Sequence, residues 1–313
     1  MKHCCVIGGC GFIGTHIVDT LLTLDRKITV IDKNPLPSKV LPKEVRYITG
    51  DFGDKNLLFE ILKDVNEVIH LAYSTVPKSS FENPISDIID NLPATVRLFE
   101  VASNLGIEKL VLVSSGGTVY GKVNEVPIKE DHPTNPISPY GITKLTCEKY
   151  ANMFYNLRGL PVVCVRPGNA YGEGQKPFTG QGFIATAIAS ILKEKEIVLY
   201  GETGTIRDYI YVTDIANGII AALEHGKPGV CYNIGSGVGR SNKDILDAIY
   251  PFAESVGLKP RVKILPLRQF DVPVNVLDST KIIQETGWEK YVSFKEGIQR
   301  TWDWLYHEHS IKV

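Results

Sequence analysis

Tyr140 and Lys144 are the two residues of this 313-residue chain whose types and spacing best suit proton transfer. Side chains four residues apart lie on one face of a helix, so the Lys144 ammonium can sit beside the Tyr140 phenol. A nearby positive charge favours the ionised phenol, and lowering a pKa of about 10 to neutrality takes roughly 4 kcal/mol of local electrostatics. The same spacing is common on solvated helix surfaces, so the pair is informative only beside other motifs.

Three glycines near the start of the chain predict a dinucleotide site. They follow the apolar run His3–Ile7, which is typical of a buried strand, and they precede an apolar helix pattern. Gly8 permits a tight turn, Gly11 lets the backbone approach a pyrophosphate, and Gly14 allows close packing of helix on strand. A glycine turn that binds no ligand is the alternative, but an acid in the expected place argues against it.

Asp32 is that acid, and it ends a second predicted strand over Lys27–Ile31. Its carboxylate would accept hydrogen bonds from the adenosine ribose hydroxyls and would repel a 2′-phosphate. The sequence therefore predicts NAD as the cofactor in preference to NADP. The neighbouring Lys33 offsets part of that preference.

The composition fits an enzyme with a large core. Hydrophobic residues make up 43% of the chain, and the formal net charge of −1 gives no basic surface for nucleic acid. There is no apolar run of about 18 residues and no signal-peptide pattern, so we expect no membrane segment and a cytoplasmic protein. The six cysteines lack C-x-x-C spacing, so we expect neither disulfides nor a metal site.

Short apolar runs alternate with helical segments, which predicts an α/β fold with a Rossmann-type, doubly wound parallel sheet. Such sheets bind ligands beyond the carboxyl ends of their strands. We expect residues 1–168 and about 207–236 to form an NAD-binding domain, and residues of about 169–206 and 237–313 to form a smaller α/β substrate lobe. The remaining predicted strands are Val45–Thr49, Val68–Leu71, Leu110–Ser114, Val162–Arg166 and Val230–Ile234.

Further motifs follow the glycine turn in order along the chain. They are Gly50-Asp51, His70-Leu-Ala72, Asn91, Ser114-Ser115 with Val119-Tyr-Gly121, Tyr140-x-x-x-Lys144, Arg166-Pro-Gly-Asn-Ala-Tyr-Gly172, Arg207-Asp-Tyr-Ile-Tyr-Val212 with Asp214, Asn233-Ile-Gly-Ser-Gly237, Arg268-x-x-Asp271 and Thr286-Gly-Trp288. Through this series the whole chain resembles the extended short-chain dehydrogenase/reductase family of NAD-dependent epimerases and dehydratases, most closely the UDP-glucose 4-epimerase type. The resemblance implies an isomerase that acts on a nucleotide sugar with bound NAD.

The resemblance also implies roles for individual residues at the cofactor. Asp51 and Phe52 would hold the adenine, Ala72 the central part of the cofactor, and Lys144 the nicotinamide ribose. For Asn91 a helix-start cap ahead of Pro93 is the alternative. The complete set expected at the cofactor is Gly8, Gly11, Phe12, Ile13, Gly14, Asp32, Asp51, Phe52, Leu71, Ala72, Asn91, Ser114, Tyr140, Lys144 and Pro167. His70, at an apolar strand end, is expected to be packed and hydrogen-bonded and not catalytic.

Two arginines, Arg207 and Arg268, provide the paired donors that a nucleotide diphosphate needs. The resemblance adds Asn169 and Asp271 to them. Asn275 falls where the family has a residue that controls the access of N-acetyl sugars, and its intermediate size leaves both sugar types open. The complete set expected at the substrate is Val76, Lys78, Thr118, Asn169, Arg207, Arg268, Asp271 and Asn275.

Two positions depart from the family pattern. Gly116 stands where 4-epimerases usually carry a hydroxyl that bonds the sugar O4 beside the tyrosine. Thr118, which shares the strand parity of position 116, or the adjacent Ser115 is expected to supply it, with Thr118 slightly favoured. Tyr73 stands where the family commonly has a small residue, and it could reshape the sugar pocket.

The resemblance implies a UDP-hexose 4-epimerase for UDP-glucose and UDP-galactose, with or without their N-acetyl forms. Tyr140 as phenolate would take the proton of the 4-hydroxyl while hydride leaves C4 for NAD, and the 4-keto sugar would then rotate and take hydride back. A dehydratase is disfavoured, because it typically has an Asp-Glu pair where this chain has Gly116-Gly117. A UDP-glucuronate epimerase or decarboxylase and a non-catalytic NAD-binding regulatory protein remain open. A homodimer through the helices near Leu92–Leu105 and Tyr140–Tyr155 is also implied.

Overall fold

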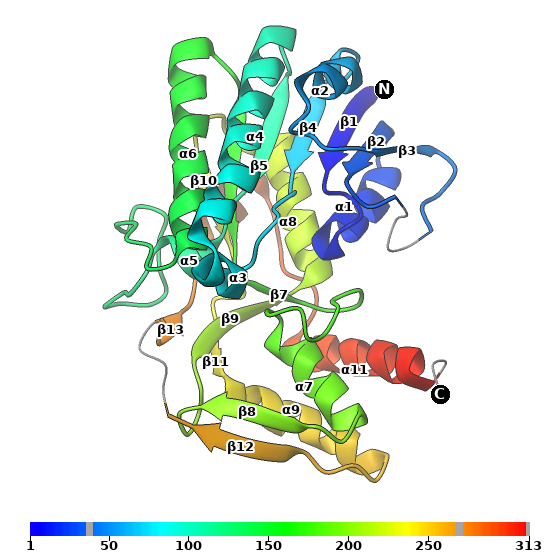
Figure 1. Cartoon of the computed structure of the whole chain (residues 1–313), viewed down its shortest axis with the longest axis vertical. Helices are drawn as coiled ribbons and strands as arrows, with labels where there is room; N and C mark the ends of the chain where they lie inside the picture. Colours follow the sequence, from blue (N-terminus) through cyan, green and yellow to red (C-terminus); the bar gives the residue numbers. More distant parts are fainter. Residues whose placement is uncertain (36–39, 267–271, 311–313) are drawn as a thin grey trace.

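The computed structural model describes residues 1–35, 40–266 and 272–310, and its larger lobe is built on a seven-stranded sheet. The strands are β1 (Lys2–Ile7), β2 (Arg26–Asp32), β3 (Val45–Thr49), β4 (Glu67–His70), β5 (Lys109–Val113), β6 (Val162–Pro167) and β10 (Cys231–Ile234). Their order is β10-β6-β5-β4-β1-β2-β3, and every neighbouring pair runs parallel. The doubly wound α/β fold predicted from the sequence is confirmed (Figure 1).

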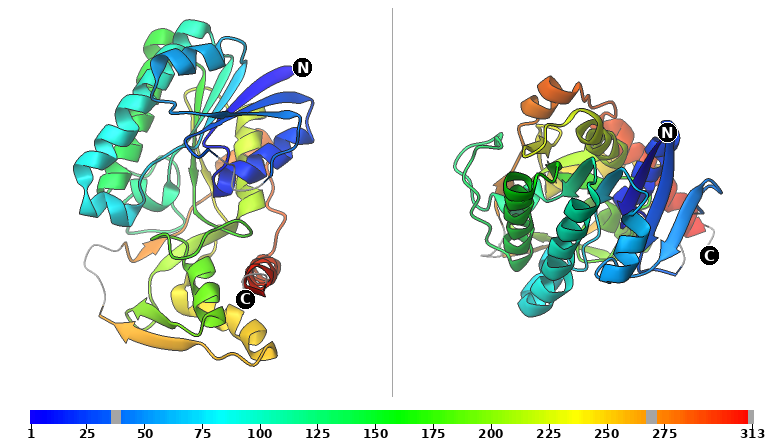
Figure 2. Two further views of the ribbon diagram at one scale, coloured as in Figure 1. Left: turned by 45° about the vertical axis from the view of Figure 1, so that its right-hand side comes forward. Right: turned by 90° about the horizontal axis from the view of Figure 1, so that it is seen from above.

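Helices cover both faces of the large sheet, as the two views in Figure 2 show. One face carries α1 (Phe12–Leu22) and α8 (Val212–His225), and the other carries α2 (Lys55–Leu62), α4 (Pro84–Leu105) and α6 (Pro139–Arg158). Because both faces are buried, the central strands are apolar along their length, as in the fully buried stretch Cys4–Ile7. None of the helices that the structure describes is long and apolar enough to cross a membrane.

A smaller lobe lies beyond the carboxyl ends of the large sheet (Figure 1). β7 (Asn169–Tyr171), β9 (Ile206–Tyr211), β11 (Gly239–Ser241) and β13 (Val274–Asn275) form one sheet, and β8 (Glu196–Tyr200) pairs with β12 (Arg261–Leu265). α7 (Phe183–Leu192), α9 (Asn242–Ser255) and α11 (Phe294–Ser310) share its core.

The division between the lobes differs in detail from the sequence-based boundaries. β9 pairs with strands of the smaller sheet, so the chain returns to the larger lobe at Val212 and not at about residue 207. Conversely, α10 (Thr280–Thr286) packs against α8 and β10 of the larger lobe, although residues 237–313 were assigned to the smaller one. β9 therefore belongs to the smaller lobe and α10 to the larger one.

Side-chain caps mark the first residues of α4 and α6. Ser138 caps α6, since its hydroxyl accepts a hydrogen bond from a first-turn amide at 3.1 Å, and Pro139 occupies the first helical position. α4 begins at Pro84, seven residues before Asn91. Its cap is Asn83, and the helix continues through Asn91 and Pro93, so the alternative that Asn91 starts a helix is wrong.

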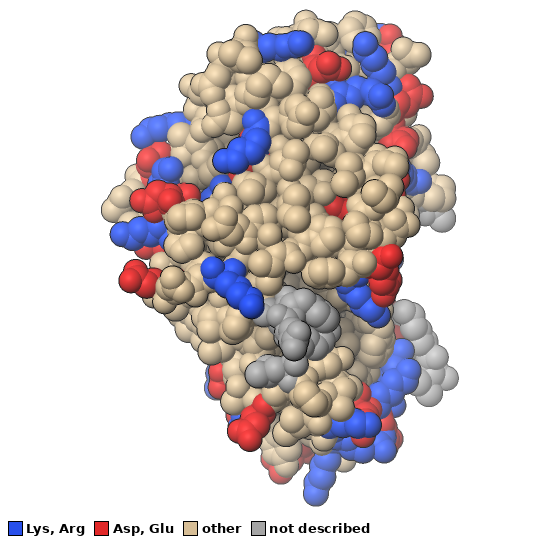
Figure 3. Space-filling view, turned by 60° about the vertical axis from the view of Figure 1, so that its left-hand side comes forward, with Lys and Arg blue, Asp and Glu red and all other residues tan. Residues whose placement is uncertain are grey.

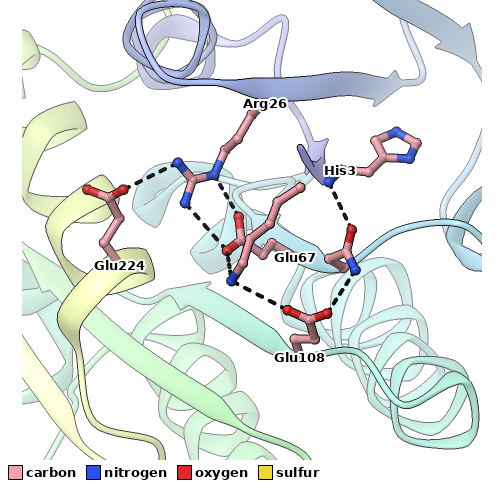
Figure 4. A network of polar contacts seen from close by, with 7 residues as sticks. His3, Arg26, Glu67, Glu108 and Glu224 are labelled. Atoms are coloured by element: carbon pink, nitrogen blue, oxygen red, sulfur yellow. Dashed lines mark hydrogen bonds and ion pairs between the residues drawn. The ribbon is translucent and has the colours of Figure 1, made fainter.

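A network of charges closes the end of the sheet that lies away from the smaller lobe (Figure 4). Glu67 is 1% exposed at the start of β4, and it accepts hydrogen bonds from Arg26 at 2.8 Å and Lys2 at 2.9 Å. Burial by itself would raise the pKa of the Glu67 carboxyl, but these two bonds outweigh burial and lower it. These ion pairs join the amino-terminal ends of β1, β2 and β4. They lie at the opposite end of the sheet from the carboxyl ends, where a ligand is expected.

Candidate functional site

A cavity of about 840 Å³ lies where the carboxyl ends of the large sheet face the smaller lobe. This is the place where a doubly wound sheet binds its ligand. Sixteen of the residues predicted from the sequence line it: Gly8, Gly11, Phe12, Ile13, Gly14, Leu71, Val76, Lys78, Ser114, Ser115, Thr118, Tyr140, Lys144, Pro167, Asn169 and Arg207. Residues at the carboxyl ends of β1, β4, β5 and β6 thus meet in one space with residues of β7 and β9.

The glycine turn at one end of the cavity has the geometry that a dinucleotide requires. Gly8 has a φ of +84°, which favours glycine. A Cβ on Gly14 would lie 2.5 Å from the Gly8 carbonyl oxygen, so only glycine lets α1 begin this close to β1. Gly11 caps α1 without a side-chain hydrogen bond, which leaves first-turn amides for an anion. The turn therefore fits the pyrophosphate of NAD.

Asp32 lies beside this turn at the end of β2. Its carboxylate accepts hydrogen bonds from the Cys10 amide at 3.3 Å and the Asn34 amide at 3.1 Å. The Lys33 ammonium does not turn toward Asp32 but pairs with Asp51 at 3.1 Å. Asp32 itself does not line the cavity, and its contact with the adenosine ribose stays a prediction.

Three further residues predicted at the cofactor, Asp51, Phe52 and Ala72, do not line the cavity. Asp51 caps the turn before α2 by accepting the Gly53 amide at 2.8 Å. The Phe52 ring is buried against His70, with 4.9 Å between the ring centres, and Ala72 packs its backbone on the glycine turn. The His70 ring nitrogen lies 3.1 Å from the Thr95 hydroxyl, so His70 is packed and hydrogen-bonded as predicted.

Tyr140 lies in the first turn of α6, half-buried in the cavity wall. The neighbouring helix α3 (Pro77–Glu82) holds it, because the Tyr140 amide donates to the Ser80 hydroxyl at 3.2 Å. Burial raises the pKa of the Tyr140 phenol, the carboxylate of Asp87 adds to this, and a hydrogen bond with Ser115 opposes it. Without a cofactor in place these groups together raise the pKa of the phenol, and the lowering of this pKa by Lys144 and a bound nicotinamide stays a prediction.

Lys144 is buried at the centre of the site, one turn after Tyr140. Its ammonium donates to the Val113 carbonyl at the end of β5 at 2.9 Å and lies 5.8 Å from the centre of the Tyr140 ring. Burial lowers the pKa of Lys144 to about 8, while Cys147, Glu148 and Asp87 favour its charged form. A group with such a pKa changes its charge close to physiological pH.

Gly116 cannot carry the hydroxyl that the family usually has at this position. A Cβ there would lie 2.5 Å from the Leu277 side chain and 2.8 Å from the Arg166 carbonyl oxygen. Residues Gly116–Val119 form the short helix α5, so the strand-parity argument that favoured Thr118 is wrong. Both Ser115 and Thr118 line the cavity, and Ser115 is the one that interacts with the Tyr140 phenol.

Asn169 and Arg207 reach the opposite wall from β7 and β9 of the smaller lobe. The Arg207 guanidinium donates to the Val272 carbonyl at 2.7 Å, which fixes its direction. Arg268 and Asp271 lie outside the described residues. The cavity is also lined by residues that the sequence analysis did not single out, although the Gly- and aromatic-rich stretch after Asn169 was a signal for them: Gln175, Gly180, Gln181, Gly182 and Phe183.

Two predicted site residues are buried behind the cavity wall. Asn91 is 2% exposed; it accepts a hydrogen bond from the Ser74 amide at 2.7 Å and donates to the Asp87 carbonyl at 2.8 Å. Asn275 is 1% exposed and donates to the Gly116 carbonyl at 3.0 Å. Asn91 thus fastens the segment before α3 to α4, and Asn275 supports α5, so each acts on the cavity through its neighbours.

A buried ion pair, not predicted from the sequence, fixes α6 to the sheet. Glu148 lies one turn after Lys144, and its carboxylate accepts three bonds from Arg166 of β6, with Nε–Oε1 at 3.0 Å, Nε–Oε2 at 3.3 Å and Nη2–Oε2 at 2.6 Å. The two side chains are 4% and 7% exposed. Arg166 was part of a recognised motif, but nothing in the spacing identified Glu148 as its partner.

Comparisons with known proteins show which sequences and structures this chain is similar to. Residues 4–235 match the model of the NAD dependent epimerase/dehydratase family. The UDP-glucose 4-epimerase of Mycolicibacterium smegmatis is 33% identical over 303 residues, which cover 95% of this chain and 96% of that protein. The crystal structure of the Thermus thermophilus UDP-glucose 4-epimerase in complex with NAD is 34% identical, with 97% and 99% of the two chains covered and a TM-score of 0.89. The UDP-N-acetylglucosamine 4-epimerase of Methanobrevibacter ruminantium, in complex with UDP-N-acetylmuramic acid, is 30% identical, with 98% and 99% covered and a TM-score of 0.89.

Proposed function

The chain belongs to the NAD dependent epimerase/dehydratase family, and on this basis we propose that it is a UDP-hexose 4-epimerase. One observation carries the proposal: the Tyr140 phenol lies in the cavity wall, in contact with Ser115 and near Lys144, in the same cavity as the glycine turn that fits NAD. A phenol in that place can exchange a proton with a sugar hydroxyl, which is the acid–base half of a C4 inversion.

In the proposed reaction Tyr140 takes the proton of the 4-hydroxyl and returns it once the sugar has presented its other face. The glycine turn and Asp32 would hold NAD, which would accept the hydride lost from C4 and return it to the 4-keto sugar. Lys144 keeps its charge below a pH of about 8 and stabilises the phenolate form of Tyr140. Ser115 holds the sugar oxygen beside the phenol, and Thr118, which has a buried hydroxyl without a partner among the described residues, is the second candidate.

A UDP-sugar is the proposed substrate because Arg207 and Asn169 line the wall opposite the glycine turn. A guanidinium matches the oxygens of a diphosphate with paired donors. We assign Arg268 and Asp271 to the same group on the resemblance of their motif alone. We propose that both plain and N-acetyl sugars are accepted, since relatives named for each type are about equally similar to this chain. Asn275 would influence this choice only through α5.

A UDP-hexuronate is the second candidate substrate. Lys78 lines the cavity with a well-exposed ammonium whose nearest ion-pair partner, Glu82, is 3.9 Å away. A sugar carboxylate at C6 could replace that partner. Dehydration is disfavoured, because Gly116 and Gly117 offer neither an acid nor a base in the helix α5.

We propose that two copies pair through α4 and α6. These adjacent helices expose large apolar side chains: Ile85 is 63% exposed, Ile89 61%, Ile142 52% and Leu157 76%. Figure 3 shows that few charged side chains lie over the centre of this face. Covering such a surface with its own copy removes it from water. Sedimentation should therefore detect a dimer, and Ile89→Asp should shift it toward monomer.

We also propose that the protein works in the cytoplasm. All six cysteines are free thiols, and five of them are buried. Free thiols are typical of a reducing compartment.

The proposal is tested by incubating the purified protein with UDP-glucose, UDP-galactose, their N-acetyl forms and UDP-glucuronate, and identifying the products by chromatography. We expect interconversion of at least one 4-epimeric UDP-hexose pair. If no pair is interconverted while NAD is bound, the epimerase proposal is wrong. Conversion of the uronate alone would select the second candidate.

A further inference from the structure

Tyr73, which stands where the family commonly has a small residue, makes two contacts with the central pair of the site. The Lys144 ammonium lies over the Tyr73 ring, 4.0 Å from its centre. The Tyr73 ring also meets the Tyr140 ring in a T-shaped arrangement, with 4.9 Å between the centres and 71° between the planes. One aromatic side chain therefore touches both proposed catalytic groups.

Elements on both sides hold Tyr73 in this position. It is the third residue after the end of β4, and the next residue, Ser74, donates its amide to the Asn91 side chain at 2.7 Å. One residue further, the Thr75 hydroxyl donates to the buried carboxylate of Asp87 on α4. Two consecutive bonds to one helix thus fix the backbone that carries Tyr73.

We propose that Tyr73 is a positioning residue for the reaction: its ring face holds the Lys144 ammonium charged and in place, and its contact with Tyr140 keeps the phenol aligned. This inference rests on the proposed roles of Tyr140 and Lys144. The face of an aromatic ring attracts a cation most strongly where water is excluded, and Lys144 is only 6% exposed.

Burial and the neighbouring acidic groups have opposite effects on the pKa of Lys144. Burial lowers its pKa to about 8, so any group that favours the ammonium matters near physiological pH. The ring of Tyr73 favours the ammonium without adding a negative charge that would raise the pKa of Tyr140. The titratable and charged groups that face Lys144 from the surrounding elements are His70 of β4, Asp87 of α4, and Tyr140, Cys147 and Glu148 of α6.

The test compares Tyr73→Leu, which removes the ring but keeps an apolar side chain, with Tyr73→Phe, which keeps the ring and removes only the hydroxyl. The pKa of Lys144 is measured by competitive labelling with acetic anhydride across pH, followed by mass spectrometry; Lys144 lines the cavity, so the small reagent can reach it. We expect Tyr73→Leu to lower this pKa by about one unit, a tenfold change worth about 1.4 kcal/mol, and Tyr73→Phe to leave it close to the wild type.

The pH dependence of kcat/KM gives a second readout. Its alkaline limb should move to lower pH in Tyr73→Leu, with a loss of about fivefold at pH 8 from the uncharged lysine alone. Phe99→Leu, which removes a fully buried ring that packs on Phe154, is the matched control and should leave the limb in place. Tyr73→Met replaces Tyr73→Leu if thermal unfolding shows that the latter does not fold.

The two readouts separate this inference from the proposed function. If a folded Tyr73→Leu variant keeps the wild-type pKa of Lys144, the inference is overturned whatever the activity. If the wild type interconverts no UDP-hexose but the pKa of Lys144 still falls in Tyr73→Leu, the role of the ring stands and the epimerase proposal is the part that fails.

Discussion

The strongest stability effect is expected at the ion pair between Glu148 and Arg166, which ties the helix of Tyr140 and Lys144 to the sheet. Glu148→Gln keeps the shape of the side chain and removes its charge. The Arg166 guanidinium would then remain 7% exposed, with the Tyr120 hydroxyl at 2.9 Å as a neutral partner in place of a carboxylate. Breaking a buried pair in this way costs about 3–5 kcal/mol, a large part of the roughly 5–15 kcal/mol by which a domain is stable.

Urea unfolding of the wild type and Glu148→Gln measures this cost directly. The matched control is Glu60→Gln, which removes a carboxylate that contacts Lys63 at 2.6 Å with both side chains about half exposed, and it should leave the unfolding midpoint unchanged. Replacing both Glu148 and Arg166 by methionine should give a more stable protein than Glu148→Gln alone, because no unpaired charge is left. A cost below about 1 kcal/mol for Glu148→Gln would refute the reasoning.

Three further predictions follow from the cavity. Gly116→Ser should destabilise the protein by about 1–3 kcal/mol in urea unfolding, since its Cβ would meet Leu277 at 2.5 Å; unchanged stability would contradict the packing argument. Ser115→Ala should lower kcat/KM more than Thr118→Val, and a loss of less than about threefold in both would show that neither hydroxyl acts on the sugar. NAD should bind at least about tenfold more tightly than NADP to cofactor-stripped protein in calorimetry, and Asp32→Ala should narrow the gap; equal affinities for the wild type would reject the role of Asp32.

The parts of the site that depend on residues close together in the sequence could be predicted from the sequence. The turn from Gly8 to Gly14 has strict steric demands, so its glycines identify both the turn and its place between β1 and α1. The four-residue spacing of Tyr140 and Lys144 likewise predicts a shared helix face. Apolar runs located all seven strands of the large sheet, and the central strands are the most apolar because both of their faces are buried.

The features that depend on tertiary packing could not be predicted. Glu148 and Arg166 are 18 residues apart, and only the packing of α6 on β6 makes them a pair. Thr118 was favoured on strand parity, but the chain turns into the helix α5 directly after Ser115. Asn275 was placed at the sugar, whereas its side chain is used behind the wall to support Gly116. In each case the residue type was compatible with more than one location in the fold, and only tertiary packing determines which location the side chain occupies.

Tyr140→Phe is the most direct test of the central claim that the Tyr140 phenol performs the acid–base step. The substitution removes one oxygen from a half-buried ring, so the unfolding midpoint and NAD binding should be retained. We predict that kcat for the interconversion of UDP-glucose and UDP-galactose falls by roughly 100-fold or more, the usual scale for loss of a general acid–base group. Tyr150→Phe, at a tyrosine that is 37% exposed on the same helix, should retain wild-type turnover. Near-native turnover by Tyr140→Phe would contradict the account.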